Sequence, residues 1–333
     1  RDGYGNDVLG SHAQHWFRGE GGLVVLLTDP WVMSAEVCAR LPLLAWIPVD
    51  HLPLIPRTHE WLTQTEAVPL AMSRWGEGVM RTNGFTPLYA PHGFDPDVFR
   101  PSEDRAAVRR SLGIPEDAFV VGMVAANKGA RKCFGEALMA FKQLRERVGR
   151  QAVIYLHTQL QDPEGVNLPG LCETIGLTPH TTDPYALAQG QPPRVVAALM
   201  GIFDVLLNPA QGEGFGIPLI EAQACGTPCI VTNFSASPEV APVEEGNWAV
   251  DGQPVWTAFE SFQCRPNVDE LTEALVEAFE EPEADRLKRR DSVRQWALRE
   301  YTADHVVQTY WRPVLEDALN QITWRKRRMV QVR

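Results

Sequence analysis

The sequence contains no long uninterrupted run of apolar residues, and residues 1–100 contain seven arginines but no lysine. A membrane-spanning helix needs about 20 predominantly apolar residues in a row, so no transmembrane segment is predicted. The chain has 31 Lys and Arg against 42 Asp and Glu, a formal net charge of −11. A nucleic-acid partner is therefore not expected, because surfaces that follow a phosphate backbone need an excess of positive charge.

Cysteines are also few, and they are scattered along the chain: Cys38, Cys133, Cys172, Cys225, Cys229 and Cys264. Only Cys225 and Cys229 are close in sequence, as C-G-T-P-C, and this spacing without a nearby histidine does not match a zinc knuckle. No metal site, disulfide framework or signal peptide is recognisable. The sequence thus favours a reducing, cytoplasmic compartment.

The length and the ordinary composition, 333 residues that are 44% hydrophobic, predict two domains. In both halves short apolar runs alternate with longer amphipathic stretches, a pattern typical of β-α repeats with parallel sheets. Strands are expected at 22–28, 43–49, 67–73, 87–91, 119–126, 152–157, 204–207 and 229–232. Helices are expected at 105–112, 133–148, 193–203, 217–224, 267–281, 283–300 and 303–321.

A polar, proline-containing stretch, F-D-P-D-V-F-R-P-S-E-D, separates the two halves. Such a composition is typical of an interdomain linker. We therefore predict a first domain at 1–100, a linker at 101–116 and a second domain at 117–302. A last helical segment at 303–333 ends in a basic tail, W-R-K-R-R-M-V-Q-V-R.

The segment 204–239 carries the most chemistry. Its predicted strand ends at Leu207, a loop with three alternating glycines follows, and a helix begins near Ile217-Pro218. Glycines let backbone N–H groups approach a ligand, and a helix N-terminus attracts an anion, so this arrangement predicts a phosphate site at the carboxyl edge of a parallel sheet. Glu213 and Glu221 lie on either side of this backbone, and carboxylates accept hydrogen bonds from paired hydroxyls. A nucleotide sugar, with hydroxyl-rich groups on both sides of a diphosphate, fits this pattern.

The stretch G-E-G-F-G-I-P-L-I-E-A-Q-A-C-G-T-P resembles the E-x7-E signature of GT-B retaining glycosyltransferases, specifically glycosyltransferase family 4 (glycosyl transferases group 1). Three more segments are similar to family motifs, in the family's order: Gly3-Tyr4-Gly5-Asn6, A-P-H-G-F-D-P-D-V-F-R-P and N-K-G-A-R-K-C-F. The resemblance implies an α/β fold of two Rossmann-like domains, with parallel sheets facing a central cleft and a last helix that crosses back to the first domain. It also implies that the first strand of the first domain, which precedes the glycine-rich loop in the family, is missing from the chain.

The resemblance further implies roles for individual residues. Glu221 resembles the residue that accepts from the ribose hydroxyls, and Glu213 the residue that contacts the transferred sugar. Arg131 and Lys132 match a basic pair that neutralises the diphosphate leaving group. The other implied donor-binding positions are Gly5 of the N-terminal loop, Asn127 of the basic loop, and the backbone N–H groups of Gly214, Phe215, Gly216 and Ile217.

One departure from the family pattern concerns positive charge. Many relatives have an arginine four or five residues before the basic pair, where this chain has Ala126 or Asn127, and Lys128 is a candidate substitute. Asp95-Pro96-Asp97 has the spacing of a metal-binding D-x-D motif, but it lies in the linker stretch and is interpreted as a turn. We therefore expect a reaction without metal or cofactor, in which cationic side chains and a helix N-terminus stabilise the leaving group.

The sequence motifs for acceptor binding are less specific than those for donor binding. Asp29 with Trp31, and Asp50 with His51, follow two strand ends. Asp50 and His51 are placed near the reaction centre by location alone, because V-D-H does not match the T-x-H pattern of the family. His92 is interpreted as a structural loop residue.

The implied function is transfer of a hexose-type sugar from a nucleoside-diphosphate sugar, with retention of configuration. The acceptor is not identified and could be a glycan, a lipid, a protein or a small molecule. A GT-B sugar-nucleotide epimerase or phosphorylase, and a non-catalytic module that binds nucleotide sugars or glycans, are the alternatives. The basic tail leaves a peripheral membrane contact open.

Overall fold

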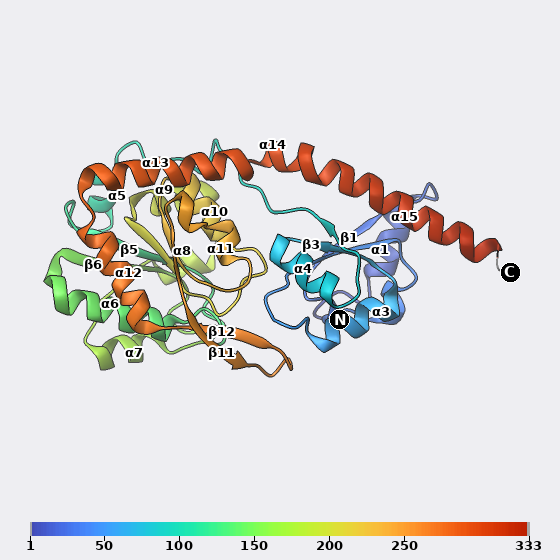
Figure 1. Cartoon of the computed structure of the whole chain (residues 1–333), viewed down its shortest axis with the longest axis horizontal. Helices are drawn as coiled ribbons and strands as arrows, with labels where there is room; N and C mark the ends of the chain where they lie inside the picture. The colour runs from blue at the N-terminus through green and yellow to red at the C-terminus, as the bar shows by residue number, and fades with distance from the viewer. Residues whose placement is uncertain (1, 332–333) are drawn as a thin grey trace.

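The chain folds into two α/β domains that are joined by a linker and spanned by its last helices (Figure 1). The computed structural model describes residues 2–331, and the side chains of residues 2–322. Each domain contains its own parallel sheet, which confirms the predicted fold class.

The first domain is built on a four-stranded parallel sheet with the order β1-β2-β3-β4. Its strands are β1 Val24–Leu27, β2 Leu43–Ile47, β3 Val68–Ala71 and β4 Leu88–Tyr89. Every residue of β2 and β3 is buried, as expected for central strands covered on both faces. The helices are α1 Leu9–Phe17, α2 Ala35–Cys38, α3 Pro56–Thr65 and α4 Arg74–Thr82, none of which the apolar pattern predicted.

The second domain contains a six-stranded parallel sheet with the order β10-β9-β8-β5-β6-β7. Its strands are β5 Phe119–Val124, β6 Ala152–His157, β7 His180–Thr181, β8 Val205–Asn208, β9 Cys229–Thr232 and β10 Trp248–Val250. The chain order reverses between β5 and β8, which pair directly. In open α/β sheets, ligands bind beyond the carboxyl ends of the strands at such a reversal. The loops after β5 and β8 are therefore the expected place for a site.

Helices cover this sheet and match the predicted segments closely where a prediction was made. They are α6 Phe134–Val148, α7 Leu168–Ile175, α8 Pro184–Ala188, α9 Pro193–Ile202, α10 Ile217–Ala224, α11 Ser237–Val240, α12 Val268–Glu280 and α13 Glu283–Glu300. Two hydrophobic clusters fill the sheet's faces, one with Phe134 and Phe141 of α6 and one with Leu219 and Ile220 of α10.

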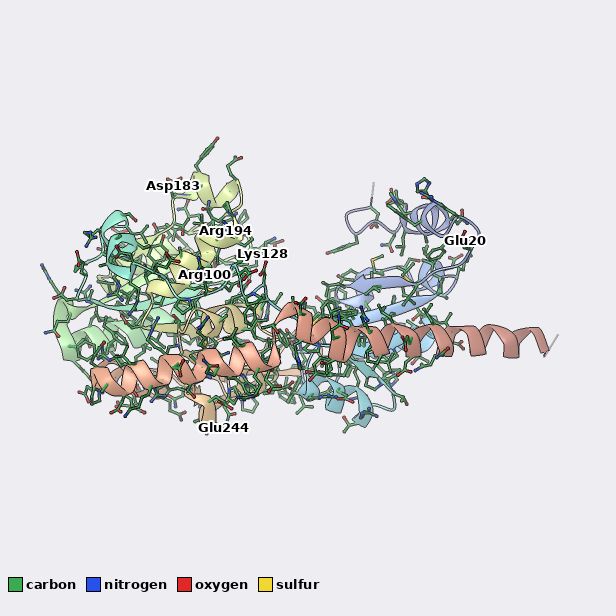
Figure 2. All side chains as sticks on the ribbon, turned by 90° about the horizontal axis from the view of Figure 1, so that it is seen from above. Glu20, Arg100, Lys128, Asp183, Arg194 and Glu244 are labelled. Carbon is green, nitrogen blue, oxygen red and sulfur yellow. The ribbon has the colours of Figure 1, made fainter. Side chains whose placement is uncertain are left out.

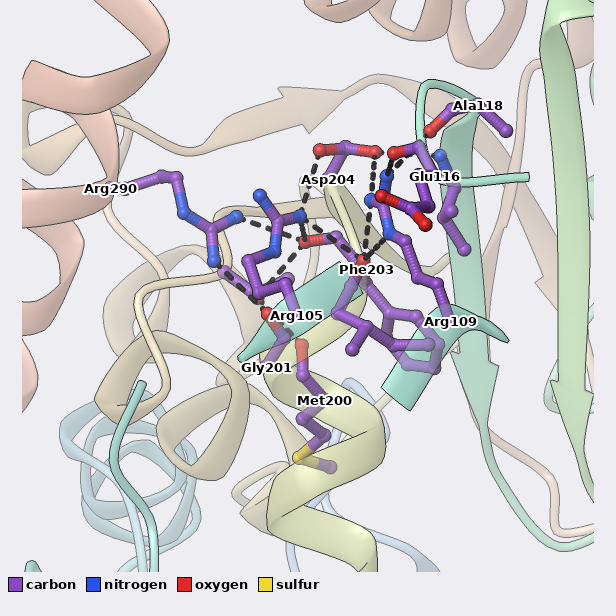
Figure 3. Close-up of polar contacts among 12 residues, drawn as sticks. Arg105, Arg109, Glu116, Ala118, Met200, Gly201, Phe203, Asp204 and Arg290 are labelled. Atoms are coloured by element: carbon purple, nitrogen blue, oxygen red, sulfur yellow. Dashed lines mark hydrogen bonds and ion pairs between the residues drawn. The ribbon is translucent and has the colours of Figure 1, made fainter. Parts of the chain in front are cut away.

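A cluster of arginines ties the linker helix α5 (Arg105–Ser111) to the amino end of β8 (Figure 3). Arg105 and Arg109 each hold one carboxylate oxygen of Asp204, with N–O distances of 2.9 and 2.8 Å. Arg109 also donates to the carbonyl of Ile202, and Arg290 of α13 donates to that of Phe203. The last carbonyls of α9, which have no partner within their own helix, are satisfied in this way.

The last helices return to the first domain. They are α14 Ala303–Val306, the π-helical turn η4 Val307–Trp311, and α15 Arg312–Gln331. Trp311 packs on Trp46 with ring centroids 4.7 Å apart, and Tyr310 packs on Tyr89 at 5.3 Å. The side chains of the predicted basic tail, 324–333, lie outside the described part. None of the helices in residues 2–331 combines the length and the apolar character that a membrane span requires.

A β-hairpin, which the sequence pattern did not predict, makes a further contact between the domains. Its strands β11 Gly252–Trp256 and β12 Phe262–Pro266 project from the second domain toward the first (Figure 1). Phe262 and Leu52 exchange two backbone hydrogen bonds of 2.9 and 3.0 Å, and the Ser261 hydroxyl donates to the carbonyl of Pro53. The hairpin therefore extends its pairing onto a loop of the first domain.

Candidate functional site

A cavity of about 650 Å³ lies between the two domains at the carboxyl ends of their strands. Its volume is in the range of sites that bind small molecules and cofactors. The first domain contributes Asp29, Trp31, Asp50, His51 and His92 to the lining, and the second contributes Lys128, Arg131, Glu213, Gly214, Phe215, Gly216, Ile217 and Phe259. Lys128 lies on the edge of the second domain that faces the first (Figure 2).

The glycine loop connects β8 to α10 and contacts the first domain. Gly216, with a φ of +98°, caps α10 in a left-handed conformation that favours glycine. A Cβ on Gly212 would lie 2.3 Å from the carbonyl oxygen of Asp50. A Cβ on Gly214 would lie 2.6 Å from the Cα of Pro48. These two glycines thus allow the domains to approach each other, a role that the sequence did not indicate.

Glu213 is at the centre of an ion cluster formed with the basic pair. Its carboxylate accepts from Lys132 and lies 3.2 Å from Nη1 of Arg131, which also donates to the carbonyl of Gly212 at 2.7 Å. Burial raises the pKa of Glu213, but the charges of Lys132 and Arg131 outweigh it and hold that pKa below its usual range. The sequence-predicted residues Glu213, Arg131 and Lys132 are therefore brought together, with Glu213 ionised.

Glu221 lies one turn into α10 and is set apart from this cluster. Within the described residues, its half-buried carboxyl has no hydrogen-bond or ion-pair partner. Burial raises the pKa of Glu221 to about 7. A desolvated carboxyl without a partner is poised to accept hydrogen bonds from a ligand.

Asp50 and His51 lie at the junction of the domains. Nδ1 of His51 is 2.6 Å from Oδ1 of Asp50, and the other carboxylate oxygen is 3.8 Å from Arg131 and 3.3 Å from the side-chain nitrogen of Gln263. His51 is 4% exposed, and its Nε2 is buried without a hydrogen-bond partner. The pair predicted by location alone therefore borders the cavity, and one ring nitrogen of His51 is left without a partner.

An aromatic pair from two domains forms another part of the lining. The rings of Trp31 and Phe259, the latter at the tip of the hairpin, have centroids 5.6 Å apart. The indole Nε1 of Trp31 is also buried without a partner. Beside them, burial and the charge of Asp50 raise the pKa of Asp29. Sequence reasoning had placed Asp29 and Trp31 past a strand end but had missed Phe259.

His92 lines the cavity as well, although the sequence suggested only a structural role. Its ring packs on Trp46 and Phe215, with centroids 4.1 and 5.1 Å away. Burial lowers the pKa of His92 to about 4, so the ring is neutral near pH 7. The sequence signal that could have indicated a site residue is the position of His92, in P-H-G directly after a short strand.

Three predicted donor-binding residues, Glu221, Asn127 and Gly5, are not part of the cavity lining, and neither is Lys132 of the predicted basic pair. Asn127 is buried and holds a neighbouring loop, since its amide donates to the carbonyls of Gln159 and Val166 and accepts from the N–H of Val166. Gly5 lies in a turn near the N-terminus, where its N–H donates to the carbonyl of Asp2.

Among residues 2–331, no group of three or more His, Cys, Asp or Glu side chains is arranged to hold a metal ion. Asp95 forms a turn in which its carboxylate accepts from the N–H of Asp97. The six cysteines are buried free thiols.

Comparison with known families gives one match that covers more than half of the chain. The family model described as "Glycosyl transferases group 1" matches residues 104–292, a segment that includes Arg131, Lys132, Glu213 and Glu221. Among known proteins, the D-inositol 3-phosphate glycosyltransferase of Corynebacterium jeikeium (strain K411) is 27% identical over 271 residues. These residues are 75% of this chain but 62% of that relative, so the chain spans less than two thirds of the relative's length.

Solved structures share the fold at low identity. HepE of Anabaena, in complex with UDP and glucose, matches with a TM-score of 0.71 and 16% identity over 92% of this chain and 81% of its own. Sucrose-phosphate synthase from Thermosynechococcus elongatus matches with a TM-score of 0.67 and 17% identity over 99% of this chain and 80% of its own. The likeness extends over both domains and is that of the GT-B fold.

Proposed function

The chain belongs to the glycosyl transferases group 1 family, and we propose that it is a retaining enzyme of family 4 that transfers a hexose-type sugar from a nucleoside-diphosphate sugar to an acceptor. The observation that carries this proposal is the cluster of Arg131, Lys132 and Glu213 near the N-terminus of α10. It sets two cations and a carboxylate close to a helix N-terminus: Arg131 and Glu213 line the cavity between the two domains, and Lys132 pairs with Glu213.

In the proposed reaction, residues of the second domain bind the sugar-nucleotide donor and stabilise its leaving group. The diphosphate lies against the N–H groups that open α10 and near Arg131 and Lys132, which stabilise the charge that develops as the nucleotide leaves. Glu221 accepts from the ribose hydroxyls, and Glu213 from the hydroxyls of the transferred sugar. The leaving phosphate oxygen takes the proton of the acceptor hydroxyl, so the new bond forms on the face from which the nucleotide departs. We propose that this chemistry needs no metal and no further cofactor.

The close contact of the domains supports a reaction protected from water. The glycine loop touches Pro48 and Asp50, and the hairpin pairs with Leu52, so the two domains are in contact beside the cavity. Exclusion of water suppresses hydrolysis of the donor. Asp50 and His51 would then face the acceptor.

The relatives suggest first substrates. The HepE structure holds UDP and glucose, so UDP-glucose is the first donor to test. The Corynebacterium jeikeium relative is named for D-inositol 3-phosphate, so this phosphorylated cyclic polyol is a first acceptor to test. Six free thiols fit a reducing compartment, and we propose the cytoplasm.

A panel of UDP-, GDP-, ADP- and dTDP-sugars tests the proposal. We expect one donor to be bound and to release its nucleoside diphosphate when an acceptor is added, in the presence of EDTA. Nuclear magnetic resonance of the product should show the donor's anomeric configuration. Change of the donor without nucleotide release would indicate an epimerase, and release of a sugar phosphate on adding inorganic phosphate would indicate a phosphorylase. Tight binding without turnover of any donor would indicate a non-catalytic module.

A further inference from the structure

The two walls of the cavity differ in charge. The charged side chains that the first domain contributes to the lining are Asp29 and Asp50, which follow the ends of β1 and β2. The cations in the lining, Lys128 and Arg131, come from the loop after β5 of the second domain. Arg131 is shared between Glu213 and Asp50, at 3.2 and 3.8 Å, and Asp29 has no ion-pair partner among the described side chains. The side that faces the acceptor is therefore acidic.

We propose that this acidic wall takes an uncharged, hydroxyl-rich acceptor, a sugar or polyol without phosphate or carboxylate, that packs against Trp31 and Phe259. The inference rests on the proposed glycosyl transfer and adds the chemical class of the acceptor. It differs from what the name of the Corynebacterium jeikeium relative suggests, because that name gives a phosphorylated polyol.

The aromatic pair suits the apolar face of a sugar ring. Trp31 and Phe259 both line the cavity, and their rings meet at 43° with centroids 5.6 Å apart. The C–H groups of a pyranose or cyclohexane ring carry a slight positive charge, which the negative face of an aromatic ring attracts. Phe259 is 38% exposed, so its ring retains free surface for such a contact.

Unsatisfied polar atoms beside this pair fit the hydroxyls. Nε1 of Trp31 can only donate, and Nε2 of His51 is buried and has no partner. Buried polar atoms in folded proteins almost always have a hydrogen-bond partner, so two orphans in one wall point to a ligand.

A negatively charged acceptor would meet repulsion on the same wall. A phosphate near Asp29 and Asp50 would place like charges together in a half-buried site. Burial raises the pKa of Asp29, and the charge of Asp50 raises it further against the opposite effects of Arg131 and His51. A neutral polyol avoids this cost.

One positive charge of the first domain, the guanidinium of Arg57, lies near the aromatic pair and could attract a phosphorylated acceptor. Arg57, at the start of α3, is exposed and stands over the Trp31 ring, with its Cζ 5.9 Å from the ring centroid. It is not part of the cavity lining. Arg57 thus lies near Trp31 without lining the cavity, and the test of the inference includes a variant at this position.

Matched acceptors give the sharpest test. With UDP-glucose, or the sugar nucleotide that the donor panel selects, nucleotide release is measured for glucose against glucose 6-phosphate and for myo-inositol against its 3-phosphate. A bound compound also displaces water and alters donor hydrolysis, so compounds that bind without being glycosylated are detected too. For compounds that are glycosylated, we expect kcat/KM to be at least about ten-fold higher for the neutral compound of each pair. For compounds that only bind, we expect the neutral compound to alter donor hydrolysis at a concentration at least about ten-fold lower.

Three outcomes overturn a claim, and they are distinguishable. Equal or better use of the phosphorylated members overturns the inference and leaves glycosyl transfer standing, above all if Arg57→Ala abolishes that use. No effect from any neutral sugar or polyol also overturns the inference. Failure of every sugar nucleotide to bind overturns the proposed function and, with it, the inference.

Variants of the hairpin separate acceptor binding from stability. Phe259→Ala is expected to raise the KM of the neutral acceptor about ten-fold, with the donor Kd unchanged. Trp256→Ala is the matched control, because Trp256 is an exposed aromatic of the same hairpin that does not line the cavity. Asp29→Lys should move the preference toward phosphorylated acceptors. An unchanged acceptor KM in Phe259→Ala, with the fold intact, would contradict the inference.

Discussion

A Cβ on Gly214 would lie 2.6 Å from the Cα of Pro48, so the glycine loop of the second domain touches the backbone of the first. Real side chains do not approach a backbone atom so closely, and a neighbour of this kind cannot rotate away. Gly214, which directly follows Glu213 in the E-x7-E segment, is therefore constrained by the other domain.

Gly214→Ala should for this reason separate the domains at the site. A displacement of about 1 Å can reduce turnover about 100-fold, and we expect a loss of at least that size in nucleotide release. Small-angle X-ray scattering should show a larger radius of gyration. Gly135→Ala in α6 is the control, since a Cβ there meets nothing within 4 Å. Full activity in Gly214→Ala would contradict the proposed closeness of the domains.

Glu213→Gln tests the ion cluster. The change removes the counter-charge of Arg131 and Lys132 and the carboxylate proposed to hold the transferred sugar. Transfer should fall about 100-fold or more. Binding of UDP, measured by titration calorimetry, should be retained or strengthened because both cations become free for the diphosphate.

The control for this variant is Glu273→Gln, which removes an exposed pair with Arg147. It should change neither transfer nor UDP binding. Loss of UDP binding together with transfer in Glu213→Gln would mean that Glu213 shapes the loop rather than contacts the sugar.

The chemistry of the second domain could be predicted from sequence because it is local. Glu213 and Glu221 lie in one strand–loop–helix unit, and α10 and β9 begin and end as predicted. The hairpin could not be predicted, because Phe262 pairs with Leu52, far away in the sequence, and its strands carry no marked alternation. Phe259 therefore had no sequence signal.

The helices of the first domain were missed for a different reason. Helix α4 contains Gly76 and Gly78, and α3 contains three threonines, residues that favour helices weakly. Both helices begin at local signals, Pro56 in α3 and the Ser73 hydroxyl that accepts from Gly76 in α4. Packing against the buried strands β2 and β3 then outweighs the weak intrinsic preference.

Arg109→Met tests the arginine cluster at the linker. Arg109 is 5% exposed and donates to Asp204, so its loss leaves a partly buried carboxylate with one cation fewer (Figure 3). Removal of one member of a buried ion pair costs about 3 kcal/mol or more. Urea unfolding should show this loss of stability. Arg110→Met, on the exposed side of the same helix, should leave the unfolding midpoint unchanged, and equal effects of both variants would contradict a special role for Arg109.

The pH dependence of donor binding tests Glu221. Its pKa is raised to about 7 by burial, and the ribose hydroxyls are proposed to bind the ionised form. As the pH falls from 8 to 6, the carboxyl becomes protonated, so the Kd of the donor should rise about ten-fold. UDP-glucose is the better probe than UDP, because a terminal phosphate group titrates near pH 6 itself, with a second pKa of about 6. Glu221→Gln should weaken binding at pH 8 and remove the pH dependence. A wild-type Kd that is flat over this range, or a dependence that persists in Glu221→Gln, would mean that Glu221 does not bind the ribose.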